Sequence, residues 1–479
     1  MPTRFSHYIN GEWVAGANWT PNLNPSDLND VIGEYAQADT DHTQAAIAAA
    51  AQAFPAWSTG SIQERANILD KAGSDILARK DEIGRLLSRE EGKTLPEGIG
   101  ETVRAGHIFK FFAGEALRLS GEKMPSVRPG VDVEITREPI GVVGLITPWN
   151  FPIAIPAWKI APALACGNTV VFKPAQWTPG CAWALTEILA NAGIPVGVFN
   201  LVMGPGSVVG DTIVNHRDVA AISFTGSMET GRSIAQKAVS RMAKIQLEMG
   251  SKNPLVVLDD AELRTAVNVA VQGAYFSTGQ RCTASSRLIV TEGIHDRFVE
   301  ALTARLATLK VDNALTPGTE IGPVVDRPQL DTDLEYISVG QREGARLAVG
   351  GERVSRSTEG YYLAPALFVD ATNSMRISRE EIFGPVACVI RAENYDEALA
   401  IANDTNTGLS SGIVTTSLKF ASHFQRHAQA GMVMVNLPTA GVDYHVPFGG
   451  RKASSYGPRE QGRYAAEFYT TVKTTYIAP

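Results

Sequence analysis

The stretch IGVVGLITPWNFPIAIPAWKIAPALACGNTVVFKPA at residues 140–175 decides the fold class of this chain. Its runs GVVGLI (141–146) and TVVF (169–172) are short and rich in β-branched residues, which predicts buried strands. The Ala-rich segment at 154–165 predicts a helix between them. Prolines interrupt the charge-free first half at every fourth position, which favours a strand and a loop over a membrane-spanning helix. This order predicts a parallel βαβ unit.

The same alternation of strands and helices continues toward the C-terminus. Further strands are expected at 198–202 and 220–223, with helices at 180–192 and 207–215. A second series begins after Gly250. Its expected strands are 253–260, 285–291, 411–417 and 432–436, and its expected helices are 261–276, 294–308 and 417–429. We therefore predict an α/β protein with two successive units.

Composition narrows the class of protein. The 479 residues are 44% hydrophobic and 19% charged, which excludes a disordered chain and a fibre and predicts two or three domains. The net charge of −7, without a run of basic residues, argues against nucleic acid as a partner. Four scattered cysteines form neither a disulfide framework nor a zinc or dithiol motif. The cysteine spacing thus gives no reason to expect a metal. The N-terminal residues lack a signal-peptide core, so we expect a soluble cytoplasmic protein without membrane contact.

Two glycine-rich turns, each between a predicted strand and a predicted helix, indicate a dinucleotide site. The turns are MGPGSVVG (203–210), with Gly206 and Gly210, and SFTGSMETG (223–231), with Gly226 and Ser227. Backbone N–H groups at the start of a helix bind the phosphates of such a cofactor. Neither turn matches the usual G-x-G-x-x-G pattern, so a plain strand-to-helix connection is the alternative for each.

Cys282 is the candidate nucleophile. It lies in the polar segment STGQRCTASS, between a predicted helix and a predicted strand, whereas the neighbours of the other cysteines are apolar or packing residues. A thiolate is a strong nucleophile, and the adjacent Arg281 is expected to lower the pKa of the thiol. The alternative is that Cys282 is a small buried hydrophobic residue, which is the commoner role of a lone cysteine.

Glu248 and Asn150 are polar residues in apolar surroundings. Glu248 lies between Leu247 and Met249, where burial is expected to raise its pKa toward the range of a general base. Its alternative role is that of an outward residue on an edge strand. Asn150 lies in a charge-free stretch, and it either caps the following helix or donates a hydrogen bond to an oxyanion. The local sequence leaves these alternatives open.

Seven motifs, taken in order, resemble those of the aldehyde dehydrogenase superfamily along nearly the whole chain. They are TPWNFP (147–152), FKPA (172–175), FTGS (224–227), LEMGSKNP (247–254), GQRC (279–282), EIFGPV (381–386) and PFGGRKASS (447–455). The resemblance implies a Rossmann-like nucleotide-binding domain (1–119 and 140–250), an α/β catalytic domain (251–446) and a small β oligomerisation element (120–139 and 464–479). It also implies a hydrolytic enzyme that uses NAD or NADP and forms a homo-oligomer, either a dimer or a tetramer.

The functional residues of the family are carried over only where its motifs match this sequence. By this resemblance, Cys282 would attack the aldehyde, Asn150 would hold the oxyanion, and Glu248 would activate the water that hydrolyses the thioester. The cofactor would contact Thr147, Trp149, Lys173, Gln176, Gly206, Gly210, Phe224, Thr225, Gly226, Ser227, Met249, Glu381 and Phe383. The aldehyde would contact Arg104, Phe151, Trp158, Arg281 and Thr283.

Three positions depart from the pattern of the family. Gln176 stands where the family often has a glutamate that binds the adenosine ribose, and a neutral side chain does not repel the 2′-phosphate of NADP. We therefore expect activity with both cofactors. The segment Met249-Gly250-Ser251 replaces a commoner L-G-G, and Ser455 replaces a common glycine. Both are interpreted as packing changes that leave the nucleophile and the base intact.

Arg104 indicates the class of aldehyde. Alignment of FFAG (111–114) places it where general aldehyde dehydrogenases have an apolar residue of the substrate tunnel. A guanidinium binds a carboxylate through two hydrogen bonds, so an acidic semialdehyde is expected. A solvent-exposed arginine is the alternative. The stretch 435–474 is most similar to 2-oxoglutarate-semialdehyde (2,5-dioxopentanoate) dehydrogenases, which makes that semialdehyde the expected substrate.

Other functions stay open as alternatives. Succinate-semialdehyde dehydrogenases tend to have an arginine at the position of Trp158, which makes that substrate the second choice, beside glutarate semialdehyde or a broad range of aliphatic aldehydes. A CoA-acylating dehydrogenase is disfavoured by Glu248, because acylating relatives typically lack this base. A catalytically idle protein of the same fold is disfavoured by the presence of Cys282, Glu248 and Asn150.

Overall fold

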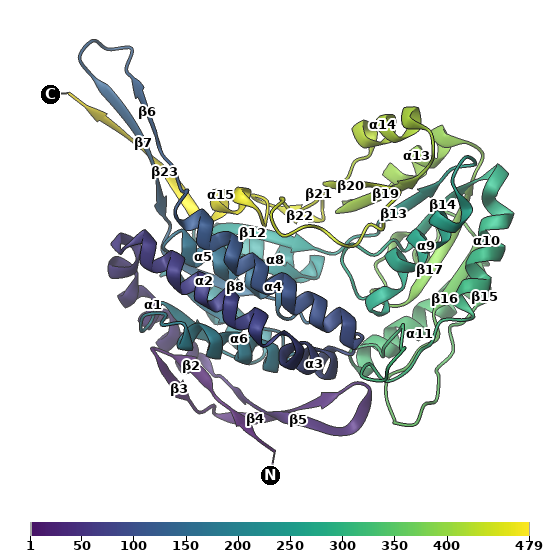
Figure 1. The fold of residues 1–479 in the computed structure, drawn as a ribbon, viewed down its shortest axis with the longest axis horizontal. Coiled ribbons are helices and arrows are strands. Elements are labelled where there is room, and N and C mark those ends of the chain that lie inside the picture. The colour runs from purple at the N-terminus through teal and green to yellow at the C-terminus, as the bar shows by residue number, and fades with distance from the viewer. Residues whose placement is uncertain (1, 479) are drawn as a thin grey trace.

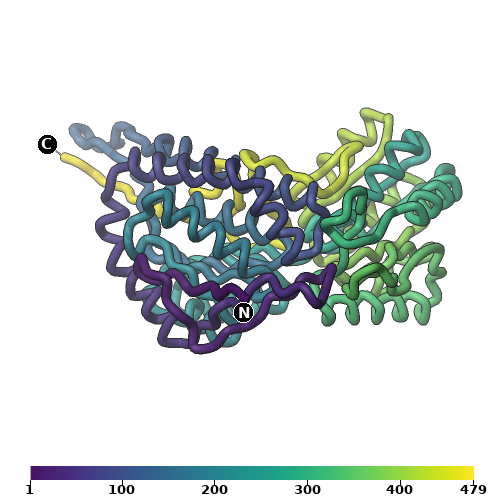
Figure 2. Tube along the Cα trace, turned by 60° about the horizontal axis from the view of Figure 1, so that its bottom comes forward, coloured from purple at the N-terminus to yellow at the C-terminus, as the bar shows by residue number. Residues whose placement is uncertain are grey.

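The computed structural model describes residues 2–478, so the first residue of the expected nucleotide-binding domain and the last of the oligomerisation element lie outside it. Two lobes stand side by side, each with a central β-sheet flanked by helices (Figures 1 and 2). A smaller three-stranded sheet projects from the first lobe (Figure 1). The predicted α/β class is confirmed.

An eight-stranded sheet forms the centre of the first lobe. Its strands, in spatial order, are β22 (Ser455–Tyr456), β12 (Lys244–Met249), β11 (Val219–Gly226), β8 (Val142–Ile146), β9 (Thr169–Lys173), β10 (Phe199–Leu201), β2 (His7–Ile9) and β3 (Glu12–Val14). The strands from β12 to β10 run parallel, whereas β22, β2 and β3 are antiparallel to their neighbours. The stretch 140–175 supplies β8 and β9 and therefore lies in the middle of this sheet.

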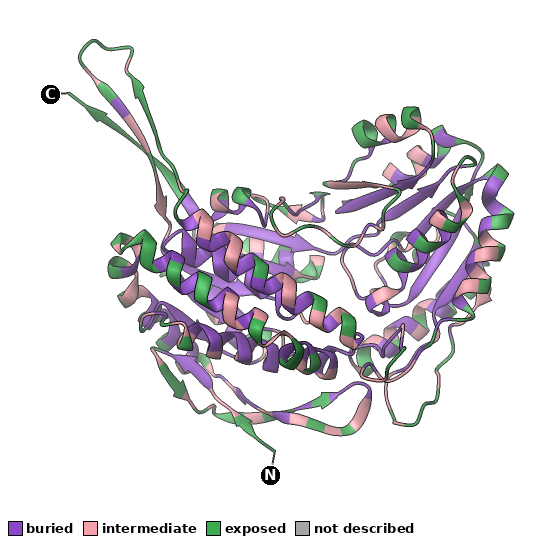
Figure 3. Cartoon of the chain, viewed as in Figure 1, coloured by how far each residue is buried: buried purple, intermediate pink, exposed green. Residues whose placement is uncertain are grey.

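Helices cover both faces of this sheet because its parallel strands are buried on both sides (Figure 3). On one face lie α2 (Ile62–Ala78), α3 (Lys80–Glu91), α4 (Leu95–Ala116), α5 (Ala154–Ala165) and α6 (Pro179–Asn191). On the other lie α1 (Thr40–Thr59), α7 (Asp211–Asn215) and α8 (Met228–Ser240). Val143 and Leu145 of β8 face the first group, whereas Val142 and Ile146 face the second, as the alternation of a strand requires.

A seven-stranded sheet forms the centre of the second lobe. Its strands, in spatial order, are β15 (Arg346–Val349), β16 (Ala366–Ala371), β17 (Val386–Ala392), β14 (Arg287–Thr291), β13 (Pro254–Val257), β19 (Ser410–Val414) and β20 (Met432–Val435). The helices of this lobe are α9 (Leu263–Ala274), α10 (Glu292–Leu306), α11 (Arg327–Arg342), α12 (Arg376–Arg379), α13 (Tyr395–Asn403) and α14 (Leu418–His427). All strands except β15 run parallel to their neighbours.

Three smaller sheets complete the structure. The projecting sheet contains β6 (Glu122–Pro125), β7 (Asp132–Pro139) and β23 (Thr470–Ile477), which follows the short helix α15 (Ala466–Tyr469). The tail strand β23 pairs with β7 along its whole length and forms one edge of that sheet. The other two sheets contain β1 (Arg4–Phe5), β5 (Asp27–Gln37) and β4 (Asn18–Asn24), and β18 (Thr407–Gly408) with β21 (Arg451–Lys452).

Three features of this arrangement bear on the expectations from sequence. Residues 447–463, which we assigned to no domain, supply β22 to the first sheet, while the domain boundaries themselves stay predictions. Among residues 2–478, no helix combines the length and apolar composition needed to cross a bilayer. The charge-free stretch 140–158 forms β8, a loop and the start of α5, as predicted.

Candidate active site

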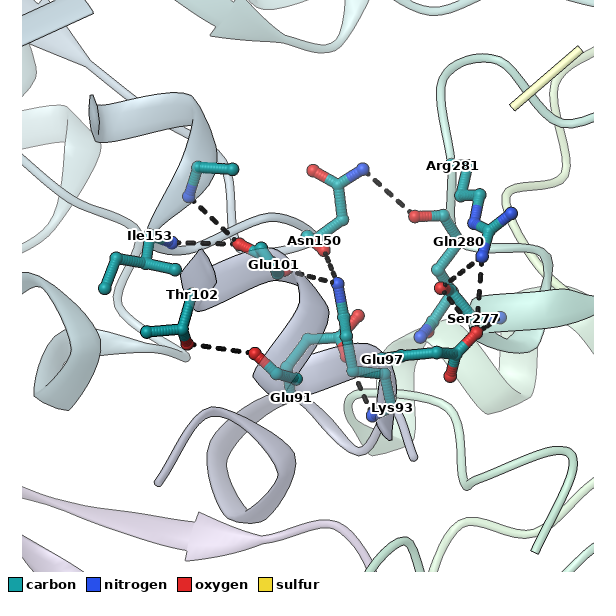
Figure 4. A network of polar contacts seen from close by, with 12 residues as sticks. Glu91, Lys93, Glu97, Glu101, Thr102, Asn150, Ile153, Ser277, Gln280 and Arg281 are labelled. Atoms are coloured by element: carbon teal, nitrogen blue, oxygen red, sulfur yellow. Dashed lines mark hydrogen bonds and ion pairs between the residues drawn. The ribbon is translucent and has the colours of Figure 1, made fainter. Parts of the chain in front are cut away.

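The segment that carries Cys282 follows a strained loop at the end of α9. Residues 277–279 have φ values of 51°, 57° and 67°, a left-handed conformation that costs energy for residues other than glycine. A Cβ at Gly279 would lie 2.2 Å from a main-chain oxygen of a neighbouring loop, so only glycine fits there. Oε1 of Glu97, on α4 of the other lobe, accepts hydrogen bonds from the N–H of Ser277 at 2.8 Å and from its Oγ at 3.0 Å (Figure 4). A helix of the first lobe therefore fixes the nucleophile loop of the second.

The thiol of Cys282 lies in an environment that favours its protonated form. Arg281, the neighbouring cation, forms an ion pair with Glu97 at 3.2 Å. Burial raises the pKa of Cys282 to about 12, and the negative charges of Glu381 and Glu248 act in the same direction. The net pKa is therefore raised and not lowered as expected, because burial and the facing carboxylates outweigh the attraction between Arg281 and the thiolate.

The side-chain amide of Asn150 lies beside the nucleophile loop. Its Nδ2 donates a hydrogen bond at 3.0 Å to the carbonyl oxygen of Gln280, two residues before Cys282. The main-chain oxygen of Asn150 accepts a bond from Nζ of Lys93 at 2.7 Å (Figure 4). The first N–H groups of α5 bind Oε1 of Glu101 at 3.1 Å, so Glu101, and not Asn150, satisfies the start of this helix. The amide of Asn150 is thus free of the capping role that the sequence left open.

Glu248 lies in β12, which has β11 on one side and β22 on the other. Its side chain is buried, and the alternative of an outward residue on an edge strand is therefore wrong. Burial raises the pKa of Glu248 well above its ordinary value, as predicted, and the negative charge of Glu460 adds to this effect. Ser455 of β22 donates a hydrogen bond to Oε2 of Glu248 at 2.5 Å. The interpretation of Ser455 as a packing change alone is therefore wrong.

A buried ion pair that the sequence analysis missed lies close to Glu248. It joins Lys159 of α5 to Glu460, and both side chains are almost completely buried. Nζ of Lys159 also donates to Oγ of Ser223 at 2.8 Å, and Nε1 of Trp158 donates to Glu460 at 2.6 Å. Lys159 is the only charged residue in IAIPAWKIAPALA (153–165). A charge in such an apolar segment is expected to be buried, and a buried charge needs a partner, so the sequence did contain a signal for this pair.

Two cavities meet at the thiol. One, of about 250 Å³, is lined among others by the predicted residues Trp149, Asn150, Trp158, Thr225, Gly226, Ser227, Glu248, Met249, Cys282, Glu381 and Phe383. The other, of about 270 Å³, is lined among others by Arg104, Phe151, Trp158, Arg281, Cys282 and Thr283. The first cavity contains predicted cofactor residues and the second predicted substrate residues. Cys282 lines both, so a cofactor and an aldehyde can reach it from different sides.

The remaining predicted cofactor residues line neither cavity. They are Thr147, Lys173, Gln176, Gly206, Gly210 and Phe224. Thr147, Lys173 and Gly206 lie at or beyond the carboxyl ends of β8, β9 and β10, and Gly226 ends β11, so they share one edge of the sheet. In open parallel sheets a dinucleotide crosses this edge. The ring of Phe224 is buried in the core between the sheet and α8, and its cofactor role, like the others, stays a prediction.

Unpartnered polar atoms and open space along this edge fit a dinucleotide. Oγ1 of Thr147 and Oγ1 of Thr225 are buried without a hydrogen-bond partner in the described part of the chain. A Cβ at Gly206 or at Gly210 would meet nothing within 4 Å, so the glycine-rich turn borders free space. Burial lowers the pKa of the Lys173 ammonium to about 8. Among residues 2–478, only the main-chain oxygen of the next residue accepts its hydrogen bond, at 2.9 Å.

The far wall of the first cavity comes from the second lobe. Oε1 of Glu381 accepts a hydrogen bond from the N–H of Ser251 at 2.8 Å, and burial raises the pKa of Glu381 to about 7. A Cβ at Gly250 would lie 1.8 Å from this carboxylate, so the glycine makes room for it. Phe383 has a φ of 66°, and its ring stands perpendicular to that of Trp149 at 5.4 Å. A strained aromatic residue held at a cavity wall is typical of a ligand contact.

Arg104 of α4 lies in the wall of the second cavity and not on the open surface. Its Nη2 donates to Oε1 of Gln461 at 3.0 Å, and its guanidinium lies 5.5 Å from the ring centre of Trp158. Its Nε is buried and has no partner among residues 2–478. Trp158 contributes its ring to the cavity and directs its N–H away, to Glu460.

A model of the aldehyde dehydrogenase family matches residues 13–475. The chain belongs to the aldehyde dehydrogenase family. It is 44% identical to an alpha-ketoglutaric semialdehyde dehydrogenase of Bacillus subtilis, over 99% of this chain and 98% of that one. It is 42% identical to a 2,5-dioxopentanoate dehydrogenase of Saccharolobus solfataricus, over 97% and 98% of the two chains.

Solved structures agree with this assignment. A betaine aldehyde dehydrogenase from Staphylococcus aureus in complex with NAD⁺ matches with a TM-score of 0.96 and 35% identity, over 99% of this chain and 95% of that one. An NADP-dependent enzyme from Escherichia coli matches with a TM-score of 0.96 and 35% identity, over 100% and 98%. The predicted fold and the predicted class, an NAD(P)-dependent aldehyde dehydrogenase, are confirmed.

This aldehyde dehydrogenase also contains a polar network that links its lobes and that sequence analysis missed (Figure 4). Glu97 and Glu101 lie four residues apart on α4 and therefore share one face of the helix. Glu97 holds the nucleophile loop, whereas Glu101 forms a buried ion pair with Lys93 at 2.7 Å and binds the start of α5. The paired spacing of these two carboxylates is the only sequence signal for the network.

Proposed function

We propose that this aldehyde dehydrogenase oxidises 2-oxoglutarate semialdehyde to 2-oxoglutarate. The observation that carries the proposal is the guanidinium of Arg104 in the cavity that ends at the thiol of Cys282. An aldehyde with a carboxylate at its far end pairs with Arg104 while its carbonyl group reaches the thiol. The names of two relatives at 42–44% identity, an alpha-ketoglutaric semialdehyde dehydrogenase and a 2,5-dioxopentanoate dehydrogenase, support the same substrate.

Cys282 begins the reaction by attack of its thiolate on the aldehyde carbon. The new S–C bond forms as the carbonyl electron pair moves to oxygen, and Nδ2 of Asn150 and the N–H of Cys282 donate hydrogen bonds to that oxygen. When bound, NAD or NADP accepts the hydride that the thiohemiacetal loses, and the positive charge of its oxidised ring favours the thiolate. A thioester on Cys282 is the result.

Glu248 then acts as the base that completes the turnover. It removes a proton from a water molecule, the water oxygen attacks the thioester carbon, and the C–S bond breaks to release the thiolate and the carboxylic acid. The acid then loses its proton to solvent and leaves as the carboxylate. Its raised pKa suits this role, because a base works best when its pKa is close to the working pH. Hydrolysis by this route needs no CoA.

The site accepts both NAD and NADP in this proposal. Gln176 is exposed, and its Nε2 lies 3.5 Å from Oε1 of Gln37, so two neutral amides stand together there. Neutral amides do not repel the 2′-phosphate of NADP as a carboxylate does. Glu381 and Phe383 would contact the nicotinamide end, and Lys173 the adenosine end.

We also propose that the chain forms a homo-oligomer in the cytoplasm through its projecting sheet. Val472, Tyr476 and Ile477 of β23 are 55%, 59% and 43% exposed, and β23 is an edge strand. An edge strand with exposed apolar side chains is a surface on which a second chain can pair. The expected oligomerisation element (120–139 and 464–479) would then meet its copy in a partner subunit.

The proposed reaction is tested with purified protein, 2-oxoglutarate semialdehyde and each cofactor, with and without CoA. We expect one equivalent of 2-oxoglutarate for each reduced cofactor, with a rate that CoA leaves unchanged. Acceleration by CoA with an acyl-CoA product would identify an acylating enzyme. If no aldehyde produces reduced cofactor, the chain is a catalytically idle member of the family.

A further inference from the structure

The hydroxyl of Ser455 is fixed between a main-chain donor and the carboxylate of Glu248. Ser455 and Glu248 stand directly opposite each other on the antiparallel strands β22 and β12, so their side chains share one face. The N–H of Gly450 donates to Oγ of Ser455 at 2.6 Å, and Oγ donates to Oε2 of Glu248 at 2.5 Å. Because the N–H occupies one lone pair of Oγ, the hydroxyl proton is directed to the carboxylate.

The other carboxylate oxygen of Glu248 is left for a water molecule. Within residues 2–478, Oε1 accepts no hydrogen bond, while Glu248 and Cys282 line the same cavity. The turn at Gly449 makes room for Oε1, because a Cβ at this glycine would lie 2.7 Å from it. One oxygen is therefore anchored, and the other is available to the reaction.

We propose that Ser455 is a positioning residue that holds Glu248 in the orientation and the ionised form that thioester hydrolysis needs. The inference rests on the proposed role of Glu248 as the base. The glycine that the family commonly has at this position lacks a side chain and cannot supply the bond. The serine therefore distinguishes this chain from the family pattern at its reaction centre.

Other charges near Glu248 also shift the pKa of its carboxyl group. Glu460 raises the pKa of Glu248, whereas Lys159 and Arg459 lower it, and Cys282 faces it across the cavity. A hydroxyl that donates to a carboxylate stabilises the charged form and so lowers its pKa. Ser455 thus partly offsets burial and Glu460. Its removal should raise the pKa of Glu248, so that hydrolysis is lost first at low pH.

The test measures the rate of thioester hydrolysis as a function of pH. Full-length enzyme is mixed with 2-oxoglutarate semialdehyde and NAD in single-turnover experiments that follow reduced cofactor and, after quenching, released 2-oxoglutarate. The variants are Ser455→Ala, Ser455→Gly and Ser455→Thr, since threonine retains the hydroxyl. Ser454→Ala is the matched control, because Oγ of this neighbouring serine binds the backbone of Gly250 and Gly408 instead.

Loss of the hydroxyl should raise the apparent pKa of hydrolysis by about one, and lower its rate about tenfold on the acidic side of the profile. Reduced cofactor should still form in a full burst, which shows that the variants are folded. Ser455→Thr and Ser454→Ala should keep the wild-type pKa. An unchanged pKa in Ser455→Ala and Ser455→Gly overturns the proposal, as does an equal rise in Ser455→Thr. Absence of the burst in the wild-type enzyme, or wild-type hydrolysis by Glu248→Gln, would instead refute the proposed function.

Discussion

Replacement of Arg104 by alanine should weaken the reaction with the acidic semialdehyde and leave neutral aldehydes almost unaffected. The guanidinium lies in the same cavity as Cys282, and within the described residues only its bond from Nη2 to Gln461 links it to another polar side chain. Donors on the guanidinium therefore remain for a substrate carboxylate. A neutral aldehyde has no group that would use them.

The expected size of the effect follows from the charge at this position. A carboxylate about 4 Å from a guanidinium gains about 4 kcal/mol at an effective dielectric constant of about 20. Desolvation of the two ions opposes this gain, and hydrogen bonds to charged groups contribute about 1.5–3 kcal/mol net. Loss of Arg104 should therefore lower kcat/KM for the acidic semialdehyde at least about tenfold, mainly through KM.

The assay compares 2-oxoglutarate semialdehyde with pentanal, a neutral aldehyde of the same chain length, for the wild-type enzyme, Arg104→Ala and Arg104→Lys. Lysine keeps the charge without the two-pronged geometry, so this variant should fall between the other two. Thermal unfolding shows whether loss of the contacts to Gln461 and Trp158 destabilises the fold. Equal losses with both aldehydes would mean that Arg104 supports structure, and its role as carboxylate ligand would then be refuted.

Three further substitutions test the chemistry. Cys282→Ser should abolish turnover, because a hydroxyl is a much weaker nucleophile than a thiolate. Thermal stabilisation by the cofactor should persist in this variant. Turnover at the wild-type rate would exclude Cys282 as the nucleophile. Glu248→Gln should give one equivalent of reduced cofactor in a burst and then turn over slowly, and a wild-type steady-state rate would remove it as the base. Gln176→Glu should lower the NADP/NAD ratio of kcat/KM by about tenfold, which corresponds to about 1.4 kcal/mol of phosphate repulsion. An unchanged ratio would show that Gln176 does not face the 2′-phosphate.

Local sequence patterns predicted the parallel core well. The helix α5 begins and ends at the predicted residues 154 and 165, and β8 and β9 agree within one residue at each end. Buried parallel strands are continuous runs of β-branched residues, and this signal does not depend on distant contacts. The pair β16 and β17 was not predicted, because only the four-residue helix α12 separates the two strands and the expected alternation with long helices fails there.

The reaction centre was less accessible to local reasoning. The resemblance to a family indicated Cys282, Glu248 and Asn150, but the pKa of the thiol was predicted in the wrong direction. Burial raises this pKa most, and the charges that add to it come from Glu381 and Glu248, which are distant in sequence from Cys282. The contact of Ser455 with Glu248 likewise joins residues 207 positions apart. Such pairings arise from tertiary structure, and no local pattern in a single sequence reveals them.

Comparison of kcat/KM among aldehydes tests the proposed substrate most directly. The panel consists of 2-oxoglutarate, succinate and glutarate semialdehydes together with pentanal, each measured with NAD and with NADP. We expect the highest value for 2-oxoglutarate semialdehyde, at least about tenfold above that for pentanal, as one charged hydrogen-bond pair implies. A value for pentanal that equals or exceeds that of every semialdehyde would contradict this expectation.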